Sequence, residues 1–140
     1  MQFDYFGNQL NPQAFSARTG KYFNDYTLTA NQLITNQSIT LTGQEMYFAI
    51  MRLMSVQTGA FRVSVYTSTS ERYQYGTQNA TTDRVRNECY FGTAQRPAVL
   101  PVPIIIPGSS AIMMDLEDVS GGTNALHLVF EGARLFPLGK

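Results

Sequence analysis

Three short apolar runs late in the chain constrain its fold more than any other feature. They span residues 99–106, 111–116 and 126–130, and turn sequences rich in glycine and serine separate them. Each run is too short for a typical helix, so strands joined by turns are the simpler interpretation. Every second residue of the second and third runs is large and apolar, which gives each strand one apolar face. We expect these two strands to pair as a hairpin across Gly121-Gly122.

Prolines mark the first of the three runs. Pro97 precedes it, and Pro101, Pro103 and Pro107 lie within it or directly after it. A proline has no N–H group to donate to a neighbouring strand, so this strand should lie at the edge of a sheet. Such an edge would be available to a partner.

The composition indicates one domain with a weakly charged surface. Of the 140 residues 44% are hydrophobic and only 14% are charged, and ten basic side chains balance ten acidic ones. No net field would attract phosphate groups or an anionic membrane, so we expect neither direct nucleic-acid binding nor membrane binding. Lys21 and Lys140 are the only lysines, and the arginine bias favours a protein partner. A lone Cys89 excludes an internal disulfide, and we expect no secretory leader and no membrane-spanning run.

Residues 1–24 are expected to form an extended N-terminal arm, and residues 25–140 the folded domain. The arm carries six aromatic residues that follow no strand or helix period: Phe3, Tyr5, Phe6, Phe15, Tyr22 and Phe23. So many rings cannot stay bare in water without a risk of aggregation. The arm should therefore lie over its own sheet or over a partner, for which aromatic anchors are suited.

The rest of the chain consists of further short strands. Residues 25–33 and 61–65 alternate between apolar and polar side chains. Residues 46–54 are apolar on both faces apart from Arg52, which suits a central strand or a short helix, and the polar turns around them favour a strand that pairs with 61–65 as a hairpin. About eight strands without a convincing helix predict an all-β fold, an eight-stranded antiparallel sandwich of the jelly-roll type.

A long polar stretch, residues 67–86, interrupts the strands. It has no apolar face, and Tyr73 and Tyr75 are its only large side chains. Loops of this length in compact domains are commonly functional or mobile, so the two tyrosines are candidate contact residues.

The residues that usually carry chemistry form no recognisable site. His127 is the only histidine and lies in an apolar run, and Cys89 has apolar neighbours that suggest burial. Asp115, Glu117 and Asp118 lack the spacing of a calcium loop, so a solvated turn is the simpler interpretation. The paired glycines precede no helix that would bind phosphate. We therefore expect no catalytic, cofactor-binding or metal-binding residues, and a protein that is not an enzyme.

The order of motifs between Arg86 and Leu135 resembles that of small structural proteins of tailed-bacteriophage heads. The residues that carry the resemblance are Asn87-Glu88, the segment Phe91–Pro97, Leu100, Pro103-Ile104, the segment Ile106–Ser110, Asp115-Leu116, Ser120-Gly121 and the segment Leu128–Gly132. Over just more than a third of its length the chain looks like a jelly-roll cement (decoration) protein from the outside of a phage capsid.

The resemblance implies a non-enzymatic virion subunit on the outer capsid surface. It would bind the major capsid protein across joints between shell subunits, and would itself form a homodimer or another small homo-oligomer. No motif of the family fixes contact residues in this sequence. The contact residues that we propose therefore come from the arm, the proline-marked edge and the polar loop. They are Phe3, Tyr5, Phe6, Phe15, Tyr22, Phe23, Tyr73, Tyr75, Arg96, Pro101 and Pro103.

Two other classes of protein remain open at this point. A head-to-tail or collar component would use the same sandwich in a ring, with a dozen copies or fewer per particle in place of hundreds. A carbohydrate-binding module would use exposed tyrosines such as Tyr73 and Tyr75 as stacking platforms, although the chain contains no tryptophan, the strongest such platform.

Overall fold

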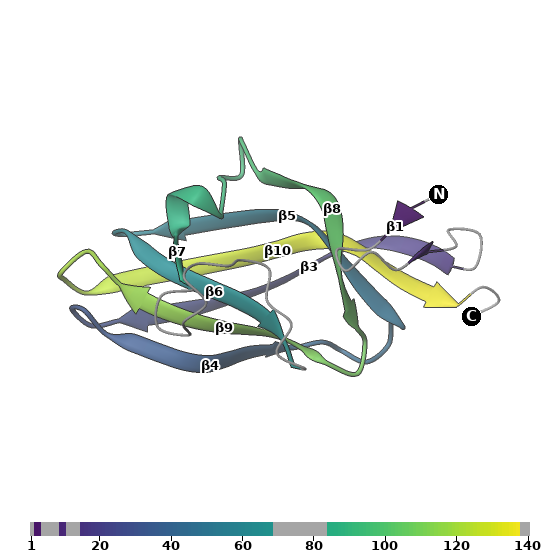
Figure 1. Cartoon of the computed structure of the whole chain (residues 1–140), viewed down its shortest axis with the longest axis horizontal. Coiled ribbons are helices and arrows are strands. Elements are labelled where there is room, and N and C mark those ends of the chain that lie inside the picture. Colours follow the sequence, from purple (N-terminus) through teal and green to yellow (C-terminus); the bar gives the residue numbers. More distant parts are fainter. Residues whose placement is uncertain (1, 4–8, 11–14, 69–83, 138–140) are drawn as a thin grey trace.

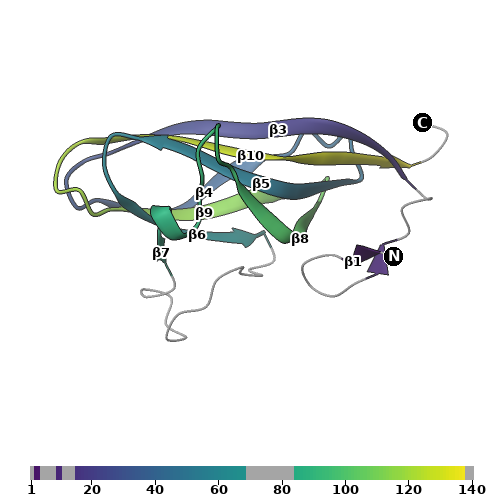
Figure 2. The same cartoon turned by 90° about the horizontal axis from the view of Figure 1, so that it is seen from above.

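Two antiparallel four-stranded sheets face each other in the computed structural model and form a β-sandwich (Figure 1, Figure 2). The structure describes residues 2–3, 9–10, 15–68 and 84–137, with side chains from Ser16 onward. The elements are β1 (Gln2–Phe3), β2 (Gln9–Leu10), β3 (Phe15–Leu28), β4 (Leu33–Thr40), β5 (Tyr47–Gln57), β6 (Phe61–Thr67), β7 (Val85–Arg86), the 3-10 turn η2 (Asn87–Cys89), β8 (Ala98–Pro107), β9 (Ala111–Asp118) and β10 (Asn124–Pro137). The predicted all-β sandwich is confirmed.

The strand order interleaves segments that are distant in the sequence. One sheet has the order β3-β10-β5-β8 and the other the order β4-β9-β6-β7, while β1 and β2 form a separate two-stranded sheet. Both predicted hairpins are wrong, because β9 and β10 lie in different sheets, and so do β5 and β6. Alternation shows which face of a strand is apolar, and a short connection can join two such strands within one sheet or across the core. Here the connections after β5 and β9 lead from one sheet to the other.

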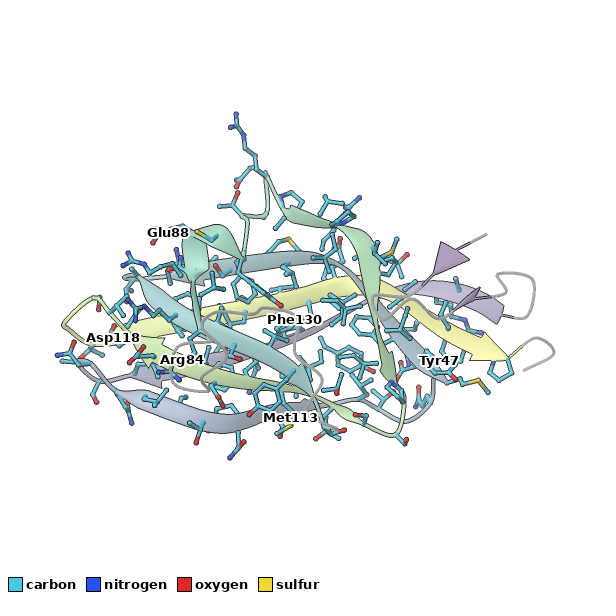
Figure 3. All side chains as sticks on the ribbon, viewed as in Figure 1. Tyr47, Arg84, Glu88, Met113, Asp118 and Phe130 are labelled. Atoms are coloured by element: carbon cyan, nitrogen blue, oxygen red, sulfur yellow. The ribbon has the colours of Figure 1, made fainter. Side chains whose placement is uncertain are left out.

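The core lies between the two inner faces. Side chains of alternate residues from both sheets fill it, and Phe130 at its centre is fully buried (Figure 3). The Phe130 ring meets the Phe91 ring edge to face, with their centroids 5.9 Å apart. The largest fully buried side chains are Phe48, Phe61, Phe130, Leu28, Ile50, Leu53, Ile104, Ile106, Ile112, Met114, Leu116 and Leu126.

The ambiguous apolar segment is a strand, as predicted: its residues 47–54 form most of β5, which lies between β10 and β8. Met51 interrupts its register on both sides. Towards β10 the pairing passes from Arg52 opposite Glu131 to Ile50 opposite Gly132, so Met51 has no partner and forms a bulge. A helix at this place would have left β8 and one side of β10 without backbone partners.

Gly132 is required where β10 passes this bulge. A Cβ atom on Gly132 would lie 1.8 Å from the carbonyl oxygen of Ala49, a backbone atom that cannot rotate away. We expect Gly132→Ala to lower the free energy of unfolding by about 3 kcal/mol, the cost of overpacking a tight site. Gly122→Ala is the control, since a Cβ atom on Gly122 would meet no other atom within 4 Å, and it should change stability by less than about 0.5 kcal/mol. Urea unfolding followed by circular dichroism measures both, and equal stabilities would contradict the close approach.

The expected boundary between arm and domain at residue 24 falls inside a strand. β3 begins at Phe15 and pairs with β10 along its whole length, from Phe15 opposite Pro137 to Leu28 opposite Asn124. Residues 15–24 therefore belong to the sandwich. The aromatic residues of this stretch concealed the strand because both of its faces carry large side chains.

Candidate binding surface

The outer face of the β3-β10-β5-β8 sheet carries several exposed apolar side chains, although a solvated sheet face commonly alternates to polar residues. In β10 the alternation turns Leu126, Leu128 and Phe130 inward and turns His127 and Val129 outward. The outward side chains of the two neighbouring strands then complete a common surface.

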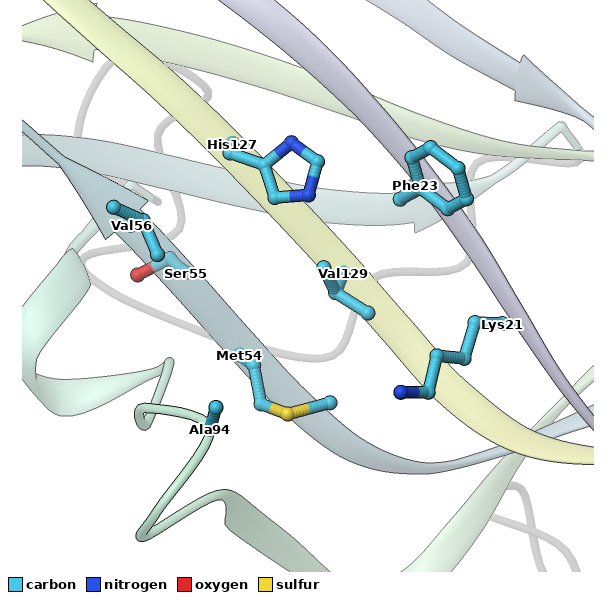
Figure 4. Close-up of a pocket in the computed structure, with 8 residues that line it drawn as sticks. All are labelled: Lys21, Phe23, Met54, Ser55, Val56, Ala94, His127 and Val129. Carbon is cyan, nitrogen blue, oxygen red and sulfur yellow. The ribbon is translucent and has the colours of Figure 1, made fainter.

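The centre of this surface is an apolar hollow of about 360 Å³. Phe23 comes from β3, Val129 and His127 from β10, and Met54 and Val56 from β5 (Figure 4). The Phe23 side chain is 61% exposed and that of Val56 is 68% exposed, so water contacts most of their apolar surface. We name the outward-facing residues Lys21, Phe23, Met54, Val56, His127 and Val129 the outer patch. Contiguous exposed apolar groups of this kind mark interaction sites.

Charged side chains border the outer patch. Glu131 forms ion pairs with Lys21 at 3.2 Å and with Arg52 at 3.3 Å. On the opposite side the Asp25 carboxylate contacts Nδ1 of His127, whose ring lies 5.7 Å from the Phe23 ring between centroids. These exposed pairs contribute little to stability, but they give the rim of the patch a fixed pattern of charge.

A second hollow of about 330 Å³ lies beside Glu131 on the same sheet face. Met51 at the bulge and Val99 and Leu100 of β8 supply its apolar lining. Val99 is 65% exposed. Exposed apolar side chains therefore lie on both sides of the Lys21–Glu131–Arg52 ion pairs on this sheet face.

β8 is an edge strand, as the prolines predict. Residues 100–103 have no partners on β5, because Val99 pairs with Arg52 and the next pair joins Ile104 to Ile50. Pro101 in this gap is exposed and Pro103 is half-buried.

The prolines also make the free edge of β8 a poor place for another strand. Gly108 donates its N–H to the carbonyl of Met46 at 2.8 Å. In an antiparallel ladder the peptide groups of successive residues point to alternate sides of the strand, so those of Pro107 point away from β5. Pro103 lies four residues earlier, so its peptide groups point to the same side as those of Pro107. Both positions lack the N–H group that an added strand would need, so contacts at β8 would come from side chains.

The aromatic contact candidates have different surroundings. Tyr22 is half-buried, its ring meets Phe48 edge to face at 4.8 Å, and its hydroxyl donates to Glu45 at 2.8 Å. It has partners within the fold, so the reason for proposing it as a contact residue does not hold. Phe23, its neighbour, points to the opposite side and lies in the outer patch.

The remaining candidates are spread over the chain. Arg96 is exposed in a turn that Thr93 closes, with its N–H bonded to the Thr93 hydroxyl at 3.1 Å. Phe3 lies in β1 and Phe15 is the first residue of β3, both without a described side chain. Tyr5, Phe6, Tyr73 and Tyr75 lie outside the described residues. The sequence did not indicate Met54, Val56 and Val129, because only the strand order brings them beside Phe23.

The carboxylates with altered pKa values belong to structural networks and not to a reactive site. Burial raises the pKa of Glu45, but hydrogen bonds from Arg134, Tyr22 and Thr42 lower it more, so the pKa lies below its ordinary value. The pKa of Asp118 lies far below its ordinary value because the Ser120 hydroxyl and several N–H groups donate to it, against the effect of burial. The expected solvated turn around Asp115 and Asp118 is wrong, since both side chains are buried.

Other reactive groups are isolated within the described part of the chain. Cys89 is exposed at the end of η2, contrary to the expected burial. No three histidine, cysteine or carboxylate side chains of the described residues are grouped to bind a metal ion. Among the same residues, no helix is long and apolar enough to cross a membrane.

Comparison with known proteins gives no relative. No family model matches the sequence, and neither a curated protein nor a solved structure is significantly similar to the chain.

Proposed function

We propose that this chain is a non-enzymatic structural protein of a bacteriophage virion, a cement protein that binds the outside of the capsid. In this role it fastens neighbouring major capsid protein subunits across their joints. The resemblance of residues 86–135 to such proteins motivates the proposal, and the exposed apolar surface of the β3-β10-β5-β8 sheet is the observation that carries it.

The proposal includes the jelly-roll form of the sandwich. In support, β10 lies between β3 and β5 in one sheet, and β9 lies between β4 and β6 in the other. Strands from the end of the chain are thus inserted between early strands in both sheets, as two Greek keys require.

The sheet surface suits a shell contact for a physical reason. Pressure from packaged DNA loads the joints between capsid subunits, and a protein bound across two of them adds an interface that must be lost before they separate. A four-stranded face could contact both subunits at once, so modest affinity for each is sufficient. Weak net charge suits such a contact, because it adds no long-range repulsion.

Val56→Glu tests the proposal on capsids. The substitution places a carboxylate within the outer patch, on its β5 side, which a bound shell protein would have to desolvate. The binding assay uses DNA-filled heads that lack this protein. We expect that at least about tenfold more of the variant than of the wild type is needed to reach the same occupancy, a loss of roughly 1.4 kcal/mol in binding free energy. Sedimentation of heads with added protein measures the occupancy.

Leu33→Glu is the matched control. Leu33 is an exposed apolar residue, 42% exposed, on β4 of the other sheet. This variant should bind heads within about twofold of the wild type. If the wild type does not bind heads, the proposed function is wrong, and if Val56→Glu binds as the wild type does, the outer patch is not the contact.

A further inference from the structure

The four outer edges of the two sheets differ in how well they are protected from pairing with another strand. β8 has prolines and an unpaired segment, β7 is only two residues long, and β4 has a register shift at which Asn36 adopts a φ of 56°. Each of these features interrupts an edge ladder.

β3 has none of these features. Its fourteen residues contain no proline, and they pair with β10 without a register shift. Among the described residues no strand pairs with its other side. A long regular edge of this kind is a template for a further strand.

The hydrogen bonding at Asp25 shows which peptide groups lie on the free side of β3. The N–H of Asp25 bonds to the side-chain oxygen of Asn24 at 2.9 Å, so it does not serve the ladder with β10. Peptide groups alternate between the two sides of an antiparallel strand. Phe23 and Lys21 lie two and four residues before Asp25, so their N–H and C=O groups also point to the free edge of β3.

The sequence of this edge is complementary to itself. If two copies of β3 run antiparallel with Phe23 on the two-fold axis, Lys21 of each copy stands opposite Asp25 of the other. Thr19 then stands opposite Thr27. An aromatic pair, two opposite-charge pairs and two threonine pairs are favourable cross-strand combinations, and no like charges meet in this register.

We propose that the free edge of β3 binds a second copy of this chain in that register, with Phe23 on the two-fold axis. The two four-stranded sheets then form one continuous sheet of eight strands. Asp25 exchanges its bond to Asn24 for backbone bonds to Lys21 of the second copy. The inference does not rest on the proposed capsid role, but it has a consequence for it: the two outer patches adjoin at Phe23 and double the contact surface.

Cysteine crosslinking tests the register directly on the isolated protein. In a Cys89→Ser background, Phe23→Cys places two thiols opposite each other, at a Cα separation of about 5.5 Å in a hydrogen-bonded pair, which a disulfide can span. We expect mild oxidation to convert most of this variant to a covalent dimer, seen on a non-reducing gel. Thr27→Cys in the same background is the control. In the proposed register position 27 of one copy stands opposite position 19 of the other, so the two thiols are eight residues, or about 27 Å, apart along the strands.

A charge exchange provides a second test that keeps Phe23. Lys21→Asp and Asp25→Lys each place like charges opposite each other twice per dimer, so each should weaken dimerisation at least about tenfold in sedimentation equilibrium. The double variant restores opposite charges and should regain most of the wild-type affinity. A monomeric wild type, a dimer without the crosslink at position 23, or a double variant no better than the single ones would overturn the proposal. Because no capsid is present, none of these results depends on the proposed function.

Discussion

Replacing Asn124 with alanine is expected to lower the free energy of unfolding by about 4 kcal/mol, and the melting temperature by roughly 12–16 °C. Asn124 is fully buried where β10 begins. Its amide donates to the carbonyls of Gly59 and Ala60 at 2.9 and 3.0 Å, and to Asp118 at 3.1 Å. Its oxygen accepts the N–H of Gly59 at 3.0 Å. One side chain thus forms hydrogen bonds to the connection between β5 and β6 and to Asp118 at the end of β9.

The cost is large because alanine leaves these backbone groups without partners in a space that it does not fill. Thr123→Ala is the control, since Thr123 is the exposed neighbour and should tolerate the change within about 0.5 kcal/mol. Urea unfolding of the two variants and the wild type gives the comparison. A loss below about 1 kcal/mol for Asn124→Ala would show that the network does not hold the sandwich together.

Replacing Arg134 with methionine is expected to lower the free energy of unfolding by about 3 kcal/mol. Its guanidinium binds the Glu45 carboxylate, whose side chain has no exposed surface. The change keeps much of the side-chain length but leaves a buried carboxylate without its cation. The expected loss lies at the low end for buried pairs because the Arg134 side chain is itself 24% exposed. Arg52→Met, which breaks the exposed pair with Glu131, should cost less than about 1 kcal/mol.

The same pair predicts how stability depends on pH. Because the folded pKa of Glu45 is lowered, its contribution is complete above the pKa of the unfolded chain, about 4.3, and is lost as the pH falls through the folded value. Glu45→Gln keeps a hydrogen-bonding group of similar size but does not titrate. The wild type should therefore lose more stability than Glu45→Gln when urea midpoints at about pH 7 and pH 3 are compared. Parallel losses would contradict the assigned role of the ion pair.

Much of the strand content was predictable from local patterns. The alternation of residues 111–116 and 126–130 placed β9 and β10, and the prolines of 97–107 placed β8 at an edge. β3 was missed over residues 15–24, because aromatic residues on both faces hide a period of two. Asn36-Gln37-Ser38 has the composition of a turn, but these residues lie inside β4, where a register shift forms a bulge and Asn36 adopts a left-handed backbone without ending the strand.

The candidate surface was predictable only at Phe23. Its exposed ring was expected to contact a partner, and it lies in the outer patch. Tyr22, the next residue along the chain, belongs to the interior, because successive side chains of a strand point to opposite faces. Val56 and Val129 looked like ordinary strand residues, and they become part of a surface only because β5 and β3 flank β10.

Local patterns in the sequence suffice to show that this chain is built from strands and which residues of most strands are apolar, because these properties depend on neighbours one and two positions away. Which strands pair, and therefore which side chains share the outer patch and which edge stays regular, is known only from the folded chain. Pairing depends on hydrogen bonds between segments that are distant in the sequence, such as β3 and β10, whose paired residues run from Leu28 opposite Asn124 to Phe15 opposite Pro137. The periodicity of one segment contains no information about its partner.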